Sequence, residues 1–374
     1  MLPRHLYVHV PFCSRRCTYC DFAIAVRRQT PVHDFLEGLR LELAALTSRW
    51  EAESSRDDWF VETLYLGGGT PSRLGGEGIS RALEVILEFA NLAANAEVTI
   101  EANPEDLTER AADAWRRAGV NRLSIGVQSF DDEVLAWMHR VHNSSDARAS
   151  VAAARAAGFD NLSLDLIFAL PESVRRSWTQ DLDAALELSP DHISLYGLTL
   201  EPSSPLGRAF SRGALPAQSD DRYAAEFLEA HERAEGAGFE HYEVSNFALP
   251  SRRSRHNSAY WSGAAYAGVG PSAHSFDGAV RSWNVAAYTE WLRRVRAAQP
   301  VEAGREALTL DNRASEALYL GLRTTDGFRV SDGELPVASR WAQAGWATLD
   351  NTTLRLSPEG WLRLDALASG LTAS

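Results

Sequence analysis

The sequence of 374 residues contains no lysine, so all 37 of its basic residues are arginines. Without lysine it cannot form the Schiff base of a pyridoxal-phosphate enzyme, nor make the phosphate contact of an ordinary P-loop NTPase. Its 50 acidic residues give a formal net charge of −13. This sign is wrong for a protein that holds nucleic acid by its phosphates, so no nucleic-acid partner is expected.

Long apolar runs are also missing. No stretch of about 18 uncharged apolar residues occurs, and the start, MLPRHLYVHVPF, lacks the pattern of a secretory signal. We therefore expect a cytoplasmic protein with at most peripheral, transient membrane contact. The length predicts two domains, or one large domain with an appendage.

Cysteine is scarce, and its three copies, Cys13, Cys17 and Cys20, all lie in the first twenty residues. An odd number packed this closely does not make a disulfide framework. Three thiolates spaced C-x3-C-x2-C can hold three corners of a 4Fe–4S cluster and leave the fourth iron open to a substrate. The alternatives are a Cys3His zinc site that uses His9, and a group of unconnected thiols.

Between residues 5 and 250, short apolar or alternating runs repeatedly precede longer segments with helical spacing. Six such units predict a parallel sheet, either open and doubly wound or closed into part of a barrel. Polar or glycine-rich residues follow five of the expected strands, and in a barrel such strand ends converge on one mouth, which favours a partial (β/α)6 TIM-like barrel. The strands are expected at 6–10, 63–69, 97–104, 122–128, 161–168 and 192–200, with helices that include 77–91, a helix from Thr108, and 219–236.

The C-terminal segment has a different pattern. A helix near 314–322, a helix over 338–345, the hairpin signal TLDNTTLRL and a helix from Ser357 predict a small winged-helix-like α+β domain. From residue 314 onward there are five arginines and seven acids, so this domain is expected to cover the barrel and not to bind DNA. The predicted divisions are a barrel over 1–240, an extension over 241–305 and the C-terminal domain over 306–374.

Two motifs together resemble the radical S-adenosylmethionine (SAM) proteins. The cysteine motif has an aromatic residue, Tyr19, before its last cysteine, and a glycine run begins at Gly67 after the second strand. Glycines let a backbone approach a ligand closely, although a turn alone would also explain them. Taken singly, Glu101 and Asp165 would equally fit helix caps, and Gln128 a solvated strand end. The resemblance covers roughly residues 5 to 285 and implies a radical SAM barrel whose SAM ligands are Tyr7, Tyr19, Gly67, Gly68, Gly69, Thr70, Glu101, Gln128, Arg140 and Asp165.

Within the radical SAM proteins, the chain resembles the branch of oxygen-independent coproporphyrinogen III dehydrogenase and the heme chaperones of the HemW type. The dehydrogenase has a further cysteine two positions after the third, where this chain has Phe22. The chaperone type carries an HNxxYW motif, present here as His256, Asn257, Tyr260 and Trp261. The resemblance implies that these four residues bind heme, with His256 on the iron. The alternative is a buried turn whose aromatic rings fill the seam beneath the C-terminal domain.

The resemblance therefore implies a heme chaperone that holds a 4Fe–4S cluster, SAM and heme and passes heme to a heme-accepting protein. An electron donor is needed if SAM is cleaved. The rival is the dehydrogenase, in which a radical from SAM takes a hydrogen from a porphyrinogen propionate. The missing cysteine at Phe22 predicts that this dehydrogenase activity is absent.

Overall fold

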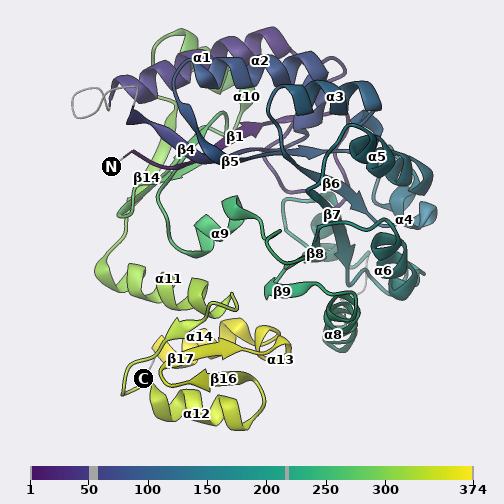
Figure 1. The fold of residues 1–374 in the computed structure, drawn as a ribbon, viewed down its shortest axis with the longest axis vertical. Helices are drawn as coiled ribbons and strands as arrows, with labels where there is room; N and C mark the ends of the chain where they lie inside the picture. Colours follow the sequence, from purple (N-terminus) through teal and green to yellow (C-terminus); the bar gives the residue numbers. More distant parts are fainter. Residues whose placement is uncertain (1, 50–57, 215–218, 373–374) are drawn as a thin grey trace.

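One sheet of twelve strands organises most of the molecule. The computed structural model describes residues 2–49, 58–214 and 219–372. Seven neighbouring strands are parallel and curve into an arc with helices on its outer side (Figure 1). In order across the sheet they are β11 (Tyr266–Val269), β1 (His5–Val10), β4 (Phe60–Gly68), β5 (Asn91–Ala102), β6 (Arg122–Gln128), β7 (Leu162–Phe168) and β8 (His192–Gly197).

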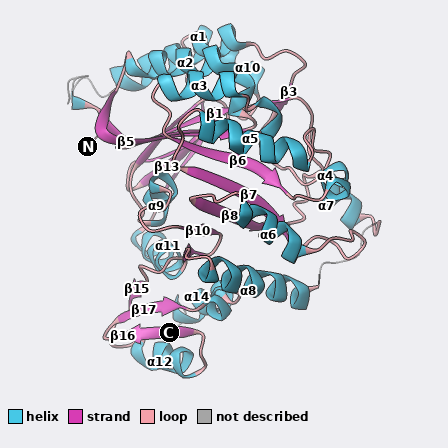
Figure 2. Cartoon of the chain, turned by 45° about the vertical axis from the view of Figure 1, so that its right-hand side comes forward, coloured by secondary structure: helices cyan, strands magenta, loops and turns pink. Residues whose placement is uncertain are grey.

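The expected partial barrel is confirmed, because helices follow each of the six parallel strands from β1 to β8 in the chain. Figure 2 shows these helices packed along one side of the strands. No helix in the described part of the chain is long and apolar enough to cross a membrane. The helices are α1 (Val32–Ser48), α2 (Gly75–Leu87), α3 (Glu109–Arg117), α4 (Asp132–Trp137), α5 (Ser144–Ala156), α6 (Trp178–Glu187), α7 (Pro205–Ser211) and α8 (Asp220–Gly236), with 3-10 turns η2 (Pro71–Leu74) and η3 (Pro104–Asp106).

The alternation of β6 explains why the barrel has a polar interior. Leu123, Ile125 and Val127 are fully buried in the apolar core, as successive side chains on one face of a strand should be. Arg122 and Ser124 alternate with them and line a cavity inside the arc. The outer face of the sheet therefore supplies the core, and the inner face supplies a site.

The end of α2 and the start of β5 differ from the bounds predicted from the sequence. The helix was expected to reach residue 91 and the strand to begin at 97, but α2 ends at Leu87 and β5 begins at Asn91. The first part of β5 has no alternating apolar pattern, and it is held by pairing of Phe60 with Asn91 and Val61 with Leu92. Backbone pairing with β4 thus forms the first part of β5, although its side chains lack the alternating pattern that predicts a strand.

Residues after 240 add strands to both edges of the sheet. The antiparallel strands β10 and β9 continue it beyond β8, and β12, β13 and β14 continue it beyond β11. The sequence did not predict β11, which makes a seventh parallel strand. The added elements are β9 (Glu240–Glu243), β10 (Asn246–Ala248), α9 (Arg255–Trp261), β12 (His274–Phe276), β13 (Val280–Asn284), α10 (Tyr288–Arg296) and β14 (Glu302–Ala307).

A buried carboxylate ties this added part to the barrel. Glu42 on α1 accepts hydrogen bonds from the backbone N–H of Gly270 at 2.8 Å and from Nε1 of Trp291 at 2.7 Å. It also accepts one from Nδ2 of Asn284 at 2.6 Å. Burial raises the pKa of Glu42 despite these three donors.

The C-terminal module has the expected order of helix, helix, hairpin and helix around a three-stranded antiparallel sheet. Arg323, just after its first helix, forms an ion pair with Glu243 on β9 at 2.9 Å and lies over the ring of Trp261 at 4.3 Å. The module therefore contacts the barrel beside α9. Its elements are α11 (Leu310–Leu322), β15 (Phe328–Arg329), α12 (Leu335–Gln343), β16 (Ala347–Asp350), β17 (Thr353–Leu356), α13 (Pro358–Trp361) and α14 (Leu364–Thr372).

Candidate functional site

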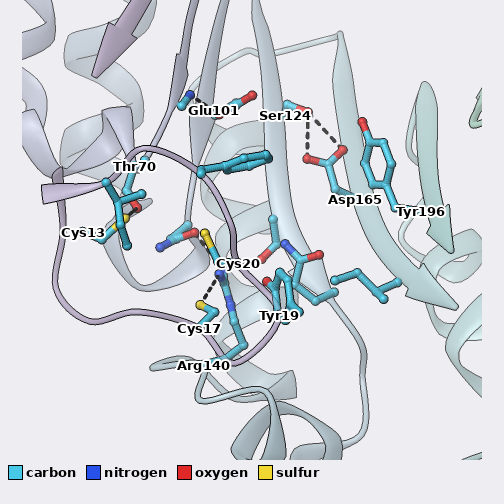
Figure 3. Close-up of a pocket in the computed structure, with 18 of the residues that line it drawn as sticks. Cys13, Cys17, Tyr19, Cys20, Thr70, Glu101, Ser124, Arg140, Asp165 and Tyr196 are labelled. Atoms are coloured by element: carbon cyan, nitrogen blue, oxygen red, sulfur yellow. Dashed lines mark hydrogen bonds between the residues drawn. The ribbon is translucent and has the colours of Figure 1, made fainter. Parts of the chain in front are cut away.

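The cysteine loop leaves the barrel directly after β1. Two short strands, β2 (Phe12–Cys13) and β3 (Ala25–Val26), pair in parallel and close the base of the loop. The sulfur of Cys13 lies 3.4 Å from the hydroxyl of Thr70, and Nη1 of Arg140 lies 3.6 Å from the sulfur of Cys17 (Figure 3). The three cysteines are thus held beside the C-terminal ends of the parallel strands.

The spacing of the sulfurs distinguishes a cluster from a single metal ion. Those of Cys13, Cys17 and Cys20 do not all lie within 4.8 Å of one another. Thiolates on one tetrahedral zinc ion at about 2.3 Å would lie about 3.8 Å apart. His9, the fourth ligand of the zinc alternative, has its ring nitrogens occupied by the hydroxyl of Tyr7 at 3.2 Å and the carbonyl of Ala23 at 3.0 Å. The residues therefore fit a 4Fe–4S cluster, in which each thiolate binds its own iron, better than zinc.

The glycine run after β4 is shaped by close neighbours. Gly68 has φ +111, and a Cβ at this position would lie 2.5 Å from the ring of His9. A Cβ at Gly69 would lie 2.6 Å from the backbone carbonyl of Pro11. Glycine is thus needed here for conformation and for space, which lets the run lie against the cysteine loop.

A cavity of about 440 Å³ opens beside the cysteine loop and extends into the barrel. Most of the predicted cluster and SAM residues line it: Cys13, Cys17, Tyr19, Cys20, Gly68, Gly69, Thr70, Glu101, Gln128, Arg140 and Asp165. Tyr7 and Gly67 do not line it. Gly67 packs against its wall, because a Cβ there would lie 3.0 Å from Oε1 of Glu101, and the Tyr7 ring lies 3.0 Å from the same position.

Two acids form one wall of the cavity. Glu101 accepts hydrogen bonds from the hydroxyl of Tyr65 and the backbone N–H of Gly68, both at 2.9 Å. The hydroxyl of Ser124 donates its single proton between the two oxygens of Asp165, at 3.0 and 2.9 Å. Burial raises the pKa of Glu101 to about 7 and also raises the pKa of Asp165. When ionised, this wall suits a cationic ligand such as the sulfonium of SAM.

Gln128 reaches the cavity through a strained backbone. It has φ +70 at the end of β6, where the pairing with β7 shifts register. A Cβ added at Gly126 would lie 2.9 Å from its Nε2, so the Gln128 side chain folds back over this glycine. A non-glycine residue in this region is uncommon and points to a functional constraint.

Helix α9 carries the HNxxYW motif at the opposite end of the barrel. His256 is 1% exposed, and its Nδ1 lies 2.7 Å from the hydroxyl of Thr63. Its Nε2 lies 2.9 Å from the hydroxyl of Tyr260, and burial lowers its pKa to about 3. Of the four motif residues, Asn257 lines the cavity, and His256, Tyr260 and Trp261 do not. In this structure both ring nitrogens of the expected heme ligand are engaged within the protein.

The sequence reasoning missed several residues of the inner wall. They share one signal, a polar or aromatic side chain at an inward position of an alternating strand. Position 65 lies two residues before Gly67, and positions 122 and 124 share the inward face of β6 with Gln128. These missed residues are Tyr65, Arg122, Ser124, Ser194 and Tyr196.

Comparison with known proteins first defines the class. Residues 7–185 match the radical SAM superfamily. The structure of coproporphyrinogen III oxidase (HemN) from Escherichia coli, a radical SAM enzyme, shares the fold with a TM-score of 0.83 and 24% identity, covering 99% of this chain and 90% of that one. The fold and the cysteine loop thus define a radical SAM protein, and this class implies a 4Fe–4S cluster and SAM.

Relatives of similar length then define the family within that class. The heme chaperone HemW of Mycobacterium tuberculosis (strain ATCC 25618 / H37Rv) is 36% identical over 375 residues, which is 99% of this chain and 95% of that protein. The heme chaperone HemW of Bacillus subtilis (strain 168) is 33% identical over 322 residues, covering 86% and 83%. The chain belongs to the HemW family.

Proposed function

We propose that this protein is a heme chaperone that holds a 4Fe–4S cluster, SAM and heme, and transfers heme to an acceptor protein. The observation that carries the proposal is identity of 36% along 95% of a relative named heme chaperone HemW. Phe22 supports it, since this residue stands at the mouth of the cavity where the dehydrogenases have a cysteine. The compartment we propose is the cytoplasm.

The cluster ligands in this proposal are Cys13, Cys17 and Cys20, and SAM occupies the cavity between them and the acidic wall. The cluster supplies an iron that the protein leaves open, to which SAM binds. The chain supplies the glycine run and Arg140, whose Nη2 donates to the carbonyl of Gly126 at 2.8 Å and is thereby fixed near Cys17. If SAM is cleaved, an external electron donor is required.

Heme is proposed to bind at α9, with His256 on its iron and Asn257, Tyr260 and Trp261 beside it. The lowered pKa of His256 keeps the imidazole neutral, which is the form that ligates iron. Because its Nε2 is hydrogen-bonded to Tyr260, ligation requires the tyrosine hydroxyl to move away.

Anaerobic reconstitution followed by titration with hemin tests the function. We expect about four irons per chain, a Soret band that saturates at one heme per chain, and passage of that heme to apomyoglobin as a model acceptor. Cys17→Ser should lose most of the iron, and Ser14→Ala, an exposed change on the same loop, should keep it. Failure of the wild-type protein to take up hemin would overturn the chaperone proposal.

Two substitutions test His256 in opposite directions. His256→Ala should weaken hemin binding at least tenfold, about 1.4 kcal/mol. Tyr260→Phe removes the competing hydroxyl and should strengthen it, while Tyr319→Phe, whose hydroxyl bonds Asp365 in the C-terminal module, should leave it unchanged. Unchanged hemin binding in both His256→Ala and Tyr260→Phe would exclude His256 as the ligand.

The rival function is dehydrogenation of coproporphyrinogen III, which the shared fold with HemN favours. Anaerobic incubation of the reconstituted protein with coproporphyrinogen III, SAM and a reductant separates the two. We expect no protoporphyrinogen beyond one equivalent per chain. Repeated turnover would establish the dehydrogenase activity. It would contradict the prediction that a chain with Phe22 in place of the cysteine lacks this activity.

A further inference from the structure

An arginine without a partner lies inside the barrel. Arg122, the first residue of β6, is 2% exposed and lines the cavity. Within the described residues, no hydrogen bond or ion pair reaches its guanidinium group, and its Nε is buried without a partner. Arginine stays charged in proteins, and an unpaired buried charge is costly. Such a group calls for an anion that the chain itself does not supply.

The acids around Arg122 already have other donors. Asp165 is held by Ser124, and Glu97 accepts the backbone N–H groups at the start of α9, at 3.1 and 3.0 Å. Glu101 accepts from Tyr65 and the glycine run. The positive charge at Arg122 therefore remains without a contacting carboxylate.

A second unpaired donor lies beside it. Thr99 on β5 pairs with Arg122 in the sheet register, and it shares the inward face of β5 with Glu101 two residues later. The Thr99 side chain is fully buried, and its hydroxyl has no hydrogen-bond partner. Two adjacent strands thus each carry an unsatisfied donor here, of which Arg122 lines the cavity and Thr99 lies outside its lining.

The chemistry of these donors favours a carboxylate. The planar guanidinium of Arg122 offers two parallel N–H groups that match a carboxylate. The acids Glu101 and Asp165 on the cavity wall oppose a ligand with more than one negative charge near them. A single carboxylate satisfies both conditions.

Arg122 lies too far from the cysteine loop to bind a carboxylate that is held at the cluster. Arg140, beside Cys17, is anchored on Gly126, and Arg122 lies four residues earlier on the same strand. At about 3.3 Å per residue this separation is about 13 Å. A carboxylate bound to the cluster iron therefore does not occupy the floor.

We propose that Arg122 binds a carboxylate of a second ligand at the floor of the barrel. The inference rests on the proposed function in naming that ligand: heme carries propionate carboxylates, and one of them is the group bound by Arg122. The other source of a carboxylate is the methionyl group of SAM.

Hemin, hemin dimethyl ester and SAM, each titrated separately into the reconstituted holoprotein, distinguish these sources. The wild-type protein should bind hemin at least tenfold more tightly than the dimethyl ester, which has no carboxylate. Arg122→Gln should remove this preference and leave SAM binding unchanged. Arg122→Lys, which keeps the charge without the planar fork, should retain part of it. Arg117→Gln, an exposed change on α3, is the matched control and should behave as wild type.

Each other outcome has a definite meaning. Equal binding of hemin and its ester by wild type overturns the role of Arg122 and leaves heme binding intact. Loss of SAM affinity in Arg122→Gln, with hemin unchanged, assigns the carboxylate to SAM and overturns the propionate. Absence of hemin binding by wild type overturns the proposed function and the propionate with it. If Arg122→Gln does not fold, the comparison of hemin with its dimethyl ester on the wild-type protein still tests whether a propionate is bound.

Discussion

The carboxylate of Glu97 on β5 accepts a hydrogen bond from the backbone N–H of His256 on α9, at 3.0 Å. Its other oxygen accepts from the N–H of Arg255 at 3.1 Å. One side chain thus satisfies two of the free donors at the start of this helix and fixes the HNxxYW motif to the sheet. The position of His256 under the barrel depends on a residue 159 positions earlier in the chain.

Glu97→Ala should detach the start of α9. Loss of two buried charge-assisted hydrogen bonds is expected to lower the free energy of unfolding by about 3 kcal/mol. Urea unfolding measures this change, and faster amide exchange at His256 should accompany it. Glu109→Ala, an exposed acid in the first turn of α3, should cost about 1 kcal/mol or less. Equal effects of the two changes would contradict the anchoring role.

Gly68→Ala should damage the proposed SAM site as well as the fold. Its Cβ would meet the His9 ring at 2.5 Å on a backbone with φ +111. We expect a loss of about 3 kcal/mol in stability and an affinity for SAM at least tenfold lower, measured by calorimetry. Gly119→Ala is the matched control, because Gly119 has φ +106 and no atom near its Cβ position. It should cost about 1 kcal/mol and leave SAM binding unchanged.

Glu42→Gln should loosen the joint between α1 and the added strands. The amide group replaces one acceptor oxygen with a donor that faces the N–H groups already pointing at it. We expect the unfolding free energy to fall by about 2 to 3 kcal/mol. Glu88→Gln, which breaks the exposed ion pair with Arg40, should change it by about 0.5 kcal/mol. A similar small change in both variants would refute the structural role of Glu42.

Stability should depend on pH through Glu101. Its pKa rises from the ordinary 4.5 to about 7 on folding, so the folded chain holds this proton more tightly than the unfolded chain. The resulting stabilisation is complete below pH 4.5 and is lost as the pH rises through about 7, an effect of about 3 kcal/mol. Without SAM, the stability of wild type relative to Glu101→Gln should fall by that amount between pH 5 and 8. Parallel pH profiles in urea unfolding would show that burial does not raise this pKa.

The sequence predicts the fold best where side chains and backbone agree. Strand β6 was expected at 122–128 and has those bounds, because apolar and polar residues alternate along its whole length. The first part of β5 and the parallel strand β11 were missed, because pairing with distant strands and not local pattern makes them strands. Thr108 was recognised as a helix cap and accepts the N–H of Ala111.

The sequence predicted those site residues that stand at or just after the ends of the expected strands. The cysteines, the glycine run, Glu101 and Asp165 meet at one cavity, as convergence of barrel strands requires. Arg122 was missed because an arginine that begins a strand usually extends into water. The engagement of His256 with Thr63 was also hidden, since these residues lie 193 positions apart. Contacts between residues so far apart in the chain form only when the strands curve into the barrel, and a local sequence pattern does not predict them.

The buried floor beneath α9 has a consequence for the order in which ligands come and go. The side chains of Thr63, Arg122, His192 and His256 at this end are almost wholly inaccessible to solvent, whereas Arg15 and Phe22 border the cavity beside the cysteine loop. Tyr196 on β8, which is 45% exposed, also borders the cavity, so the cavity opens beside the cysteine loop and at β8, while its floor is buried. If SAM lies beside the cysteine loop, as proposed, it stands between Arg122 and one of these two openings. We therefore expect bound SAM to slow the release of a molecule from Arg122 without touching it.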